Sequence, residues 1–398
     1  MKVLFRLTIF SIFVLALLFI IAYARGYRLD LEKKLLTPTG ILAISSSPRA
    51  AKVYLDGELK GVTDLNITLP PGEYRIMVKK DGYANWEKKL ILKGELVESI
   101  DALLFPINPS LLPLTNLGIT KAIPIDHSEN LLLFSANDSF EKDGIYLFDP
   151  NTKPISFFPP LKLIALKSIF PIDTDFTQIG EVIFSPDRKQ AICNFKDVSY
   201  LLSLETENKQ ISPITPDSIL NLTTAWDTEK QTEITKILET YPLKIKKIAS
   251  DSFKMISFSP DNTKAIYQAK QDIQLPLIIS PPLIASNQTQ ENRNLQANNY
   301  YIYDKKEDKN FGLNIKDQSS TFDLLTSILW YPDSKRIVIN EEKQISISNY
   351  DSENKQVVYS GPFEKEFLSV TSDGKLIILT NLNSQINKLP DIYAVGIK

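Results

Sequence analysis

The 398-residue sequence contains a single histidine, His127, and a single cysteine, Cys193. One cysteine cannot form a disulfide within the chain, and a zinc site built from cysteine and histidine needs about four such ligands. The single cysteine excludes an intrachain disulfide, and the two counts together exclude a zinc site of this composition. Cys193 lies in the apolar run QAICNF, which favours a buried hydrophobic role over that of a nucleophile.

Neither sign of charge is in excess, because 47 acidic residues accompany 45 lysine and arginine residues. Basic residues do not alternate with aromatic ones as they do on nucleic-acid-binding surfaces, so we expect no nucleic acid partner. Phosphate-binding loops, HExxH motifs and Ser-x-Gly elbows are missing from the sequence. The sequence therefore predicts no catalytic residues, no cofactor and no metal site, and we expect the protein not to be an enzyme.

Long apolar runs are confined to the N-terminus. Leu7 to Ala24 is an uncharged stretch of 18 residues, preceded by Lys2 and Arg6. About 20 apolar residues span a bilayer, so this run predicts a transmembrane helix within residues 1–25, followed by a juxtamembrane linker over 26–40.

A cleaved signal peptide is the alternative, because Ala22-Tyr23-Ala24 has the A-x-A pattern of a cleavage site. The run exceeds the usual apolar core of about 7–15 residues, and it continues into Tyr23 and Tyr27, which suit the membrane interface. These features favour an uncleaved single-pass anchor in the cell membrane. A short N-terminal tail is rarely exported ahead of a long β-rich domain, so we expect most of the chain to be extracytoplasmic.

Residues 41–105 alternate apolar and polar positions between short turns. Asp56-Gly57 is a two-residue hairpin turn, and Pro70-Pro71-Gly72 precedes a strand with Tyr74, Ile76 and Val78 on one face. This pattern predicts a small, self-contained β-sandwich. Its expected core residues are Val53, Leu55, Tyr74, Ile76, Val78 and Trp86.

The same stretch, SSPRAAKVYLDGELKGVT...LPPGEYRIMVKKDGYANWEKKLIL, resembles the PEGA domain family. The shared features are Pro48 to Ala51, the Asp-Gly hairpin, the Pro-Gly-Glu-Tyr turn and Gly82-Tyr83. The resemblance implies a small β-sandwich of a kind found mostly in surface proteins, with no catalytic residue among the shared positions.

Residues 112–398 repeat an apolar-x-Pro-Asp motif that is followed by a lysine and a strand. The copies are FSPDRKQAI, FSPDNTKAIY and WYPDSKRIVI, with VTSDGKLIIL and PIDHSENLLLF as weaker versions. Because one such unit cannot bury its own apolar faces, several must stack, and a β-propeller is the natural closed arrangement. The motif resembles TolB-like and WD-repeat-like propellers, which implies an irregular propeller of about five to seven blades.

The motif aspartates Asp187, Asp261, Asp333 and Asp373 have two interpretations. They can be metal or acid–base carboxylates, or they can fix the turn by accepting hydrogen bonds from the main chain two residues on. The sequence favours the turn, because these residues recur wherever the turn recurs.

Two segments interrupt the repeat. Residues Asp227 to Tyr241 predict one helical insertion, with capping-box spacing between Thr228 and Gln231 and an apolar stripe that ends at Tyr241. Gln271 to Asn299 contains three prolines, with six large aliphatic residues between Leu275 and Ile284, and long loops of this kind are often functional. These aliphatic residues are the predicted partner contacts: Leu275, Leu277, Ile278, Ile279, Leu283 and Ile284.

Taken together, the patterns predict an all-β surface protein of a bacterial cell envelope with an N-terminal membrane anchor. We expect the PEGA-like module and the propeller to bind a protein or an envelope polysaccharide. The alternative is a propeller hydrolase or lyase whose carboxylates meet in the central channel, since residues on different blades come together there.

Overall fold

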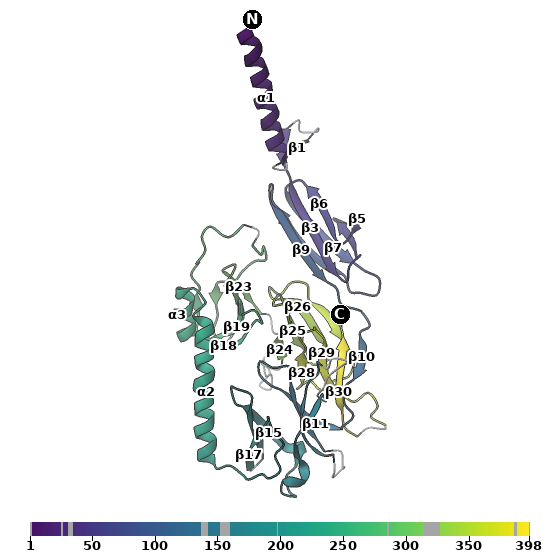
Figure 1. Ribbon diagram of the computed structural model, residues 1–398, viewed down its shortest axis with the longest axis vertical. Coiled ribbons are helices and arrows are strands. Elements are labelled where there is room, and N and C mark those ends of the chain that lie inside the picture. Colours follow the sequence, from purple (N-terminus) through teal and green to yellow (C-terminus); the bar gives the residue numbers. More distant parts are fainter. Residues whose placement is uncertain are drawn as a thin grey trace. The chain divides into compact units, whose positions relative to one another are not determined.

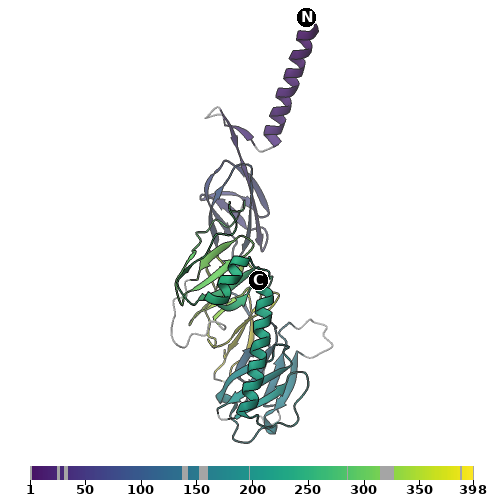
Figure 2. The ribbon, with the colours of Figure 1, turned by 90° about the vertical axis from the view of Figure 1, so that its left-hand side faces the viewer.

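The computed structural model describes residues 2–24, 27–30, 35–136, 142–151, 160–196, 198–284, 286–313, 327–385 and 388–397 (Figures 1 and 2). The chain divides into two compact units. The N-terminal unit comprises Met1–Ile107 and the segment Pro281–Gln290, and the C-terminal unit comprises Asn108–Ser280 and Glu291–Ile397.

The N-terminal unit begins with the helix α1 (Lys2–Ala24). Its stretch Phe5–Ala24 is long and apolar enough to cross a membrane, and none of that window is buried. Phe10, Phe13 and Phe19 are each more than 60% exposed. The helix thus has the length and surface of a membrane anchor or of a signal peptide.

A short hairpin occupies the predicted linker. Strands β1 (Tyr27–Asp30) and β2 (Leu35–Pro38) are antiparallel, with Tyr27 opposite Pro38. The predicted linker therefore contains paired main chain on both sides of the undescribed residues 31–34.

Two sheets make up the predicted β-sandwich. One has the strand order β6-β3-β9, in which β3 and β9 are parallel, and the other has the order β5-β4-β7-β8. The strand bounds are β3 (Gly40–Ser47), β4 (Lys52–Leu55), β5 (Glu58–Val62), β6 (Leu65–Leu69), β7 (Gly72–Lys79), β8 (Trp86–Leu92) and β9 (Val97–Leu103).

The core predicted for this sandwich is confirmed. Leu42, Val53, Ile76 and Trp86 belong to one buried cluster with contributions from both sheets, and Tyr74 packs against it while remaining partly exposed. The alternation of apolar and polar residues therefore assigns the inward faces of the strands correctly.

In the described residues of the C-terminal unit, five antiparallel sheets of three or four strands follow one another. Their strand orders are β11-β12-β13-β14, β15-β16-β17, β18-β19-β22-β23, β24-β25-β26-β27 and β10-β30-β29-β28. The strands of the first three sheets are β11 (Ile119–Pro124), β12 (Leu131–Ser135), β13 (Gly144–Phe148), β14 (Leu161–Leu166), β15 (Ile179–Phe184), β16 (Gln190–Phe195), β17 (Val198–Ser203), β18 (Phe253–Phe258), β19 (Lys264–Ala269), β22 (Tyr300–Asp304) and β23 (Lys309–Gly312). Those of the last two are β24 (Ile328–Trp330), β25 (Arg336–Asn340), β26 (Ile345–Asn349), β27 (Gln356–Tyr359), β28 (Leu368–Val370), β29 (Leu376–Thr380), β30 (Asp391–Gly396) and β10 (Ser110–Pro113). Single-turn 3₁₀ helices span Lys167–Ile169 and Phe176–Gln178.

The last sheet joins the two ends of this unit. Strand β10, the first strand of the unit, pairs with β30, the last one, so that Ser110 lies opposite Gly396 and Pro113 opposite Tyr393. The final sheet is thus completed by the strand that precedes all the other described strands of this unit.

Hydrophobic clusters connect neighbouring sheets. Phe134 of the first sheet and Phe195 of the second share one cluster, with their ring centroids 6.4 Å apart. Other clusters join the first sheet to the last and the third to the fourth. Each sheet therefore buries apolar surface against a neighbour that a single sheet could not cover.

The helical insertion is longer than the sequence pattern predicts. Helix α2 spans Pro216–Leu238, so it begins 11 residues before the predicted start, and α3 spans Leu243–Ser252. The hydroxyl of Thr215 caps α2 by accepting from the Ser218 N–H, and Pro216 occupies the first turn. The predicted capping box is wrong, because Thr228 lies inside the helix and its hydroxyl donates to the Thr224 carbonyl.

The predicted apolar stripe of this helix is confirmed. Leu238 and Tyr241 are buried, and Ile234 and Ile237 pack against the same cluster. Figures 1 and 2 show α2 as one long helix that follows β17 and leads through α3 to β18.

Candidate functional site

The turn aspartates of the repeat share one backbone conformation. Each is followed by a residue in the left-handed region, where glycine is favoured. These residues and their φ angles are His127 (52°), Arg188 (62°), Asn262 (54°), Ser334 (57°) and Gly374 (85°). The weaker copies PIDHSENLLLF and VTSDGKLIIL therefore form the same turn as the three clear ones.

The aspartate carboxylates hold these turns together. Asp187 Oδ1 accepts from Ser185 Oγ at 2.7 Å and from the Lys189 N–H at 3.1 Å. Asp261 Oδ1 accepts from Ser259 Oγ and the Thr263 N–H at the same distances. These hydrogen bonds are the ones that the turn interpretation predicts, so carboxylate atoms that could serve a reaction are already engaged within the turn.

Ionisation of these carboxylates is favoured by the same contacts. Hydrogen bonds from Ser185 and the Lys189 N–H lower the pKa of Asp187. Burial opposes ionisation of Asp261, but the hydrogen bonds from Ser259 and Thr263 outweigh it and hold its pKa well below the usual range. A general acid needs a raised pKa near neutral pH, so neither group has the electrostatics of one.

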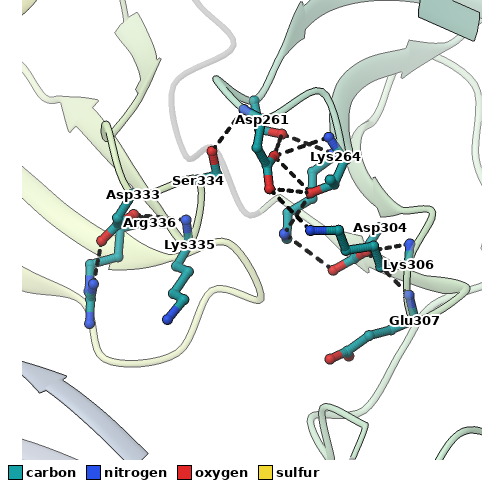
Figure 3. Close-up of polar contacts among 11 residues, drawn as sticks. Asp261, Lys264, Asp304, Lys306, Glu307, Asp333, Ser334, Lys335 and Arg336 are labelled. Carbon is teal, nitrogen blue, oxygen red and sulfur yellow. Dashed lines mark hydrogen bonds and ion pairs between the residues drawn. The ribbon is translucent and has the colours of Figure 1, made fainter. Parts of the chain in front are cut away.

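Oppositely charged groups surround Asp261 in the third sheet (Figure 3). Lys306 Nζ lies 3.5 Å from Asp261 Oδ2, and the buried Lys264 Nζ lies 3.4 Å from Asp304 Oδ2. Lys264 also stands 4.8 Å from the centre of the Tyr350 ring. Because lysines compensate these carboxylates, the cluster resembles an ion-pair network rather than a cation site. In the described part of the chain no group of three or more His, Cys, Asp or Glu side chains is placed to hold a metal.

The same cluster connects two sheets. The Asp261 N–H donates to Ser334 Oγ at 3.1 Å, which links the turn before β19 to the turn before β25 (Figure 3). Within the second of these turns, Asp333 Oδ1 accepts from the Lys335 and Arg336 N–H groups at 2.8 and 3.0 Å. The repeated motif therefore positions one sheet against the next.

The six predicted partner contacts have different surroundings. Leu275 is 2% exposed and belongs to a core cluster against which Ile278 packs, and Ile279 is half-buried. Leu277, Leu283 and Ile284 are 49%, 46% and 76% exposed. The first half of the insertion is thus partly built into the C-terminal unit, and the partner-contact prediction now rests on these three exposed residues.

Asp308 and Arg293 hold both ends of this insertion. The carboxylate of Asp308 is almost fully buried and accepts from the N–H groups of Ile278 and Ile279 at 2.6 and 2.9 Å, and from the Tyr303 hydroxyl at 2.9 Å. Arg293 Nη1 donates to the Pro276 carbonyl at 2.8 Å, and Nη2 lies 3.3 Å from Asp308 Oδ2.

Asp308 and Arg293 belong to none of the sequence motifs described above. The insertion also contains a hairpin of β20 (Ile273–Gln274) and β21 (Asn294–Leu295), so the part without strand pairing is shorter than the insertion itself. The sequence offers one indication of their role: charged residues close to a proline-rich stretch can hydrogen-bond its main chain and fix its ends.

Comparison with known families identifies the N-terminal sandwich. Residues 39–104 match the PEGA domain family. The chain contains a PEGA domain. The matched residues coincide with strands β3 to β9, so the PEGA domain includes both sheets of the sandwich and Trp86 at its core.

Similarity outside the PEGA domain is weak. No curated protein matches the chain. A putative TolB from Agrobacterium tumefaciens is similar at 14% identity with a TM-score of 0.21, and the match covers 65% of this chain and 69% of that one. A Trichoderma reesei carbohydrate-active enzyme of family AA12 is similar at 8% identity with a TM-score of 0.30, covering 74% and 97% of the two chains. Likenesses at this level decide neither the fold nor the function.

Proposed function

We propose that the protein is a membrane-anchored extracytoplasmic binding protein. The observation that carries the proposal is the order of its parts: α1, with its exposed apolar surface, precedes a PEGA domain by only a short hairpin. An apolar helix surface of this kind is stable in a lipid bilayer and costly in water. The PEGA domain suits this location, because the resemblance implies a surface protein.

We further propose that the C-terminal unit is a five-bladed β-propeller. Its five consecutive sheets and the pairing of β10 with β30 support this, because propellers often combine the first and last strands in one blade. The propeller then offers a rigid surface to a protein or an envelope polysaccharide. Crosslinking in native membranes, followed by identification of the attached molecule, tests the binding role.

The anchor can be tested by N-terminal sequencing of the membrane-extracted protein. We expect the sequence to begin upstream of Leu7 and the protein to resist alkaline extraction. A mature N-terminus at Arg25 shows cleavage after Ala24 and contradicts the anchor. Ala24→Leu is the matched control, because a large residue blocks cleavage at A-x-A without shortening the apolar run.

The extracytoplasmic location can be tested by thiol labelling. Cys193 is fully buried, and its burial raises the pKa of its thiol, so we expect the native protein not to react with a maleimide. A Glu229→Cys variant places a thiol on the exposed face of α2. We expect a membrane-impermeant maleimide to label this variant in intact spheroplasts; labelling only after permeabilisation contradicts the proposal.

The alternative function is a propeller hydrolase or lyase with its active site in the central channel. What favours it is that residues from separate sheets can meet there. Against it, the repeated carboxylates are engaged in turns and ion pairs. Turnover of envelope glycans by the purified protein, abolished by substitution of a carboxylate on an innermost strand, supports the alternative.

A further inference from the structure

Strand β8 is an edge of the PEGA domain, and one side chain occupies part of that edge. Gln288 belongs to the segment Pro281–Gln290 of the same compact unit. Its Oε1 accepts from the Ile91 N–H at 2.7 Å, and its Nε2 donates to the Ile91 carbonyl at 3.0 Å. One side-chain amide therefore makes the pair of hydrogen bonds that a residue of a neighbouring β-strand makes.

The geometry of a β-strand extends this observation along β8. Main-chain groups of alternate residues point to the same side of a strand, so the N–H and carbonyl of Lys89 point outward as those of Ile91 do. Both side chains are exposed, Ile91 by 55%. Among the described residues neither Lys88 nor Lys89 has an ion-pair partner. The edge thus presents the main-chain groups of Lys89 and Ile91, with one apolar and one positively charged side chain on the same face, whereas half-buried Lys88 lies on the other face.

We propose that β8 is a docking edge for an extended segment of a partner protein, and that Gln288 holds this edge until the partner binds. The partner segment pairs with β8 through main-chain hydrogen bonds, as in β-strand addition. It carries an acidic residue beside Lys89 and an apolar residue beside Ile91, because these positions become direct cross-strand neighbours. This inference rests on the proposed binding role and names its surface and the chemistry of the partner.

The main alternative is that Gln288 and the lysines only protect the edge from association, since lysine on edge strands prevents unwanted pairing. The two interpretations differ when Gln288 is removed. A docking edge then binds a peptide with a glutamate and an apolar residue two positions apart, whereas a purely protected edge binds none.

The test uses the full-length protein in detergent micelles, the Gln288→Ala variant and the matched control Gln290→Ala, which alters an exposed glutamine two positions on. The probes are acetylated threonine hexapeptides in which a glutamate and a valine lie two positions apart, or in which a lysine takes the place of that glutamate. Binding is measured by fluorescence anisotropy, and amide hydrogen exchange is followed in the fragment from Lys88 to Lys93.

We expect Ile91 exchange to be slow in the native protein and in Gln290→Ala, and faster in Gln288→Ala. The glutamate peptide should bind Gln288→Ala at least about tenfold more tightly than the native protein, slow exchange at Lys89 and Ile91, and outcompete the lysine peptide. Equal binding of both peptides, no binding to Gln288→Ala, or unchanged Ile91 exchange overturns the inference. Failure of the extracytoplasmic proposal is detected separately by the thiol labelling, which does not depend on β8.

Discussion

The main-chain N–H of Asp261 donates a hydrogen bond to the hydroxyl of Ser334, although 73 positions separate the two residues. The two residues occupy equivalent turns of the repeat: Asp261 lies in the turn before β19, and Ser334 lies in the turn before β25. Ser334 adopts a φ of 57° and is 4% exposed, so its hydroxyl is held toward the neighbouring turn. The motif that shapes each turn therefore also connects adjacent sheets.

Removal of this hydroxyl should destabilise the C-terminal unit. We expect Ser334→Ala to lower its free energy of unfolding by about 1 kcal/mol, because the Asp261 N–H loses its acceptor. Ser334→Gly also lacks the hydroxyl but suits a positive φ, so its loss should be smaller. Denaturant titration measures both; an alanine variant as stable as the native protein contradicts this role.

Acidification should weaken the repeated turns. The pKa values of Asp187, Asp261 and Asp373 are lowered in the folded chain, so their stabilising effect is present above the unfolded-state pKa of about 3.9 and is lost as pH falls through the folded-state values. We expect Tm to decrease as the pH drops below about 4, and to decrease less steeply in Asp261→Asn. The exposed turn residue Asp81 provides the control, since Asp81→Asn removes one charge without touching the repeat.

Trp86 should contribute to the PEGA domain through its size rather than its polar atom. It is 4% exposed, and its Nε1 has no hydrogen-bond partner among the described residues. Trp86→Ala should cost about 3–5 kcal/mol, whereas Trp86→Phe, which keeps most of the ring volume, should cost less than half as much. Thermal unfolding of both variants checks this; equal losses indicate a hidden polar role for the indole.

Asp308 should determine whether the insertion keeps its conformation. Asp308→Ala leaves Arg293 and two N–H groups without their buried acceptor, so we expect a loss of about 3–5 kcal/mol and rapid proteolysis between Pro276 and Arg293. Asp272→Ala is the control, because exposed Asp272 contributes a single hydrogen bond to the Ala297 N–H. Comparable cleavage of the two variants contradicts this role of Asp308.

The partner-contact prediction is tested by point substitutions in the insertion and not by its deletion. Replacing residues 272–297 with a short turn also removes the buried residues Leu275 and Leu295, so it would unfold part of the third sheet for reasons unrelated to a partner. Substituting Leu283→Ser and Ile284→Ser instead alters exposed side chains and leaves the contacts of Asp308 and Arg293 intact. We expect these changes to reduce partner crosslinking while Tm stays unchanged.

Local patterns were sufficient to predict much of the fold. The uncharged run predicted α1, and strict alternation placed Val53, Ile76 and Trp86 in the core of the PEGA domain. The turn motif predicted the hydrogen bonds of Asp187 and Asp261, because all the atoms involved lie within a few residues. Each of these features is determined over a short span of sequence.

Features that depend on distant residues were missed. The start of α2 at Pro216 was overlooked because the exposed first half of the helix has a weak apolar stripe, and its cap at Thr215 was not considered. Asp308 has no distinctive local motif, and its importance comes from Ile278 and Arg293, which lie 30 and 15 positions away. The pairing of Gln288 with Ile91 spans 197 positions, which no periodicity reveals.

The pairing of β10 with β30 also determines when the C-terminal unit can fold during synthesis. Ser110 leaves the ribosome long before Gly396, its partner in the sheet. The final sheet must therefore wait until β30 has been translated, and contacts over such a separation form slowly because closing a long loop costs entropy. A nascent chain that stops before Asp391 leaves β10 and β29 with unpaired edges, which are open to misassociation and to quality-control proteases.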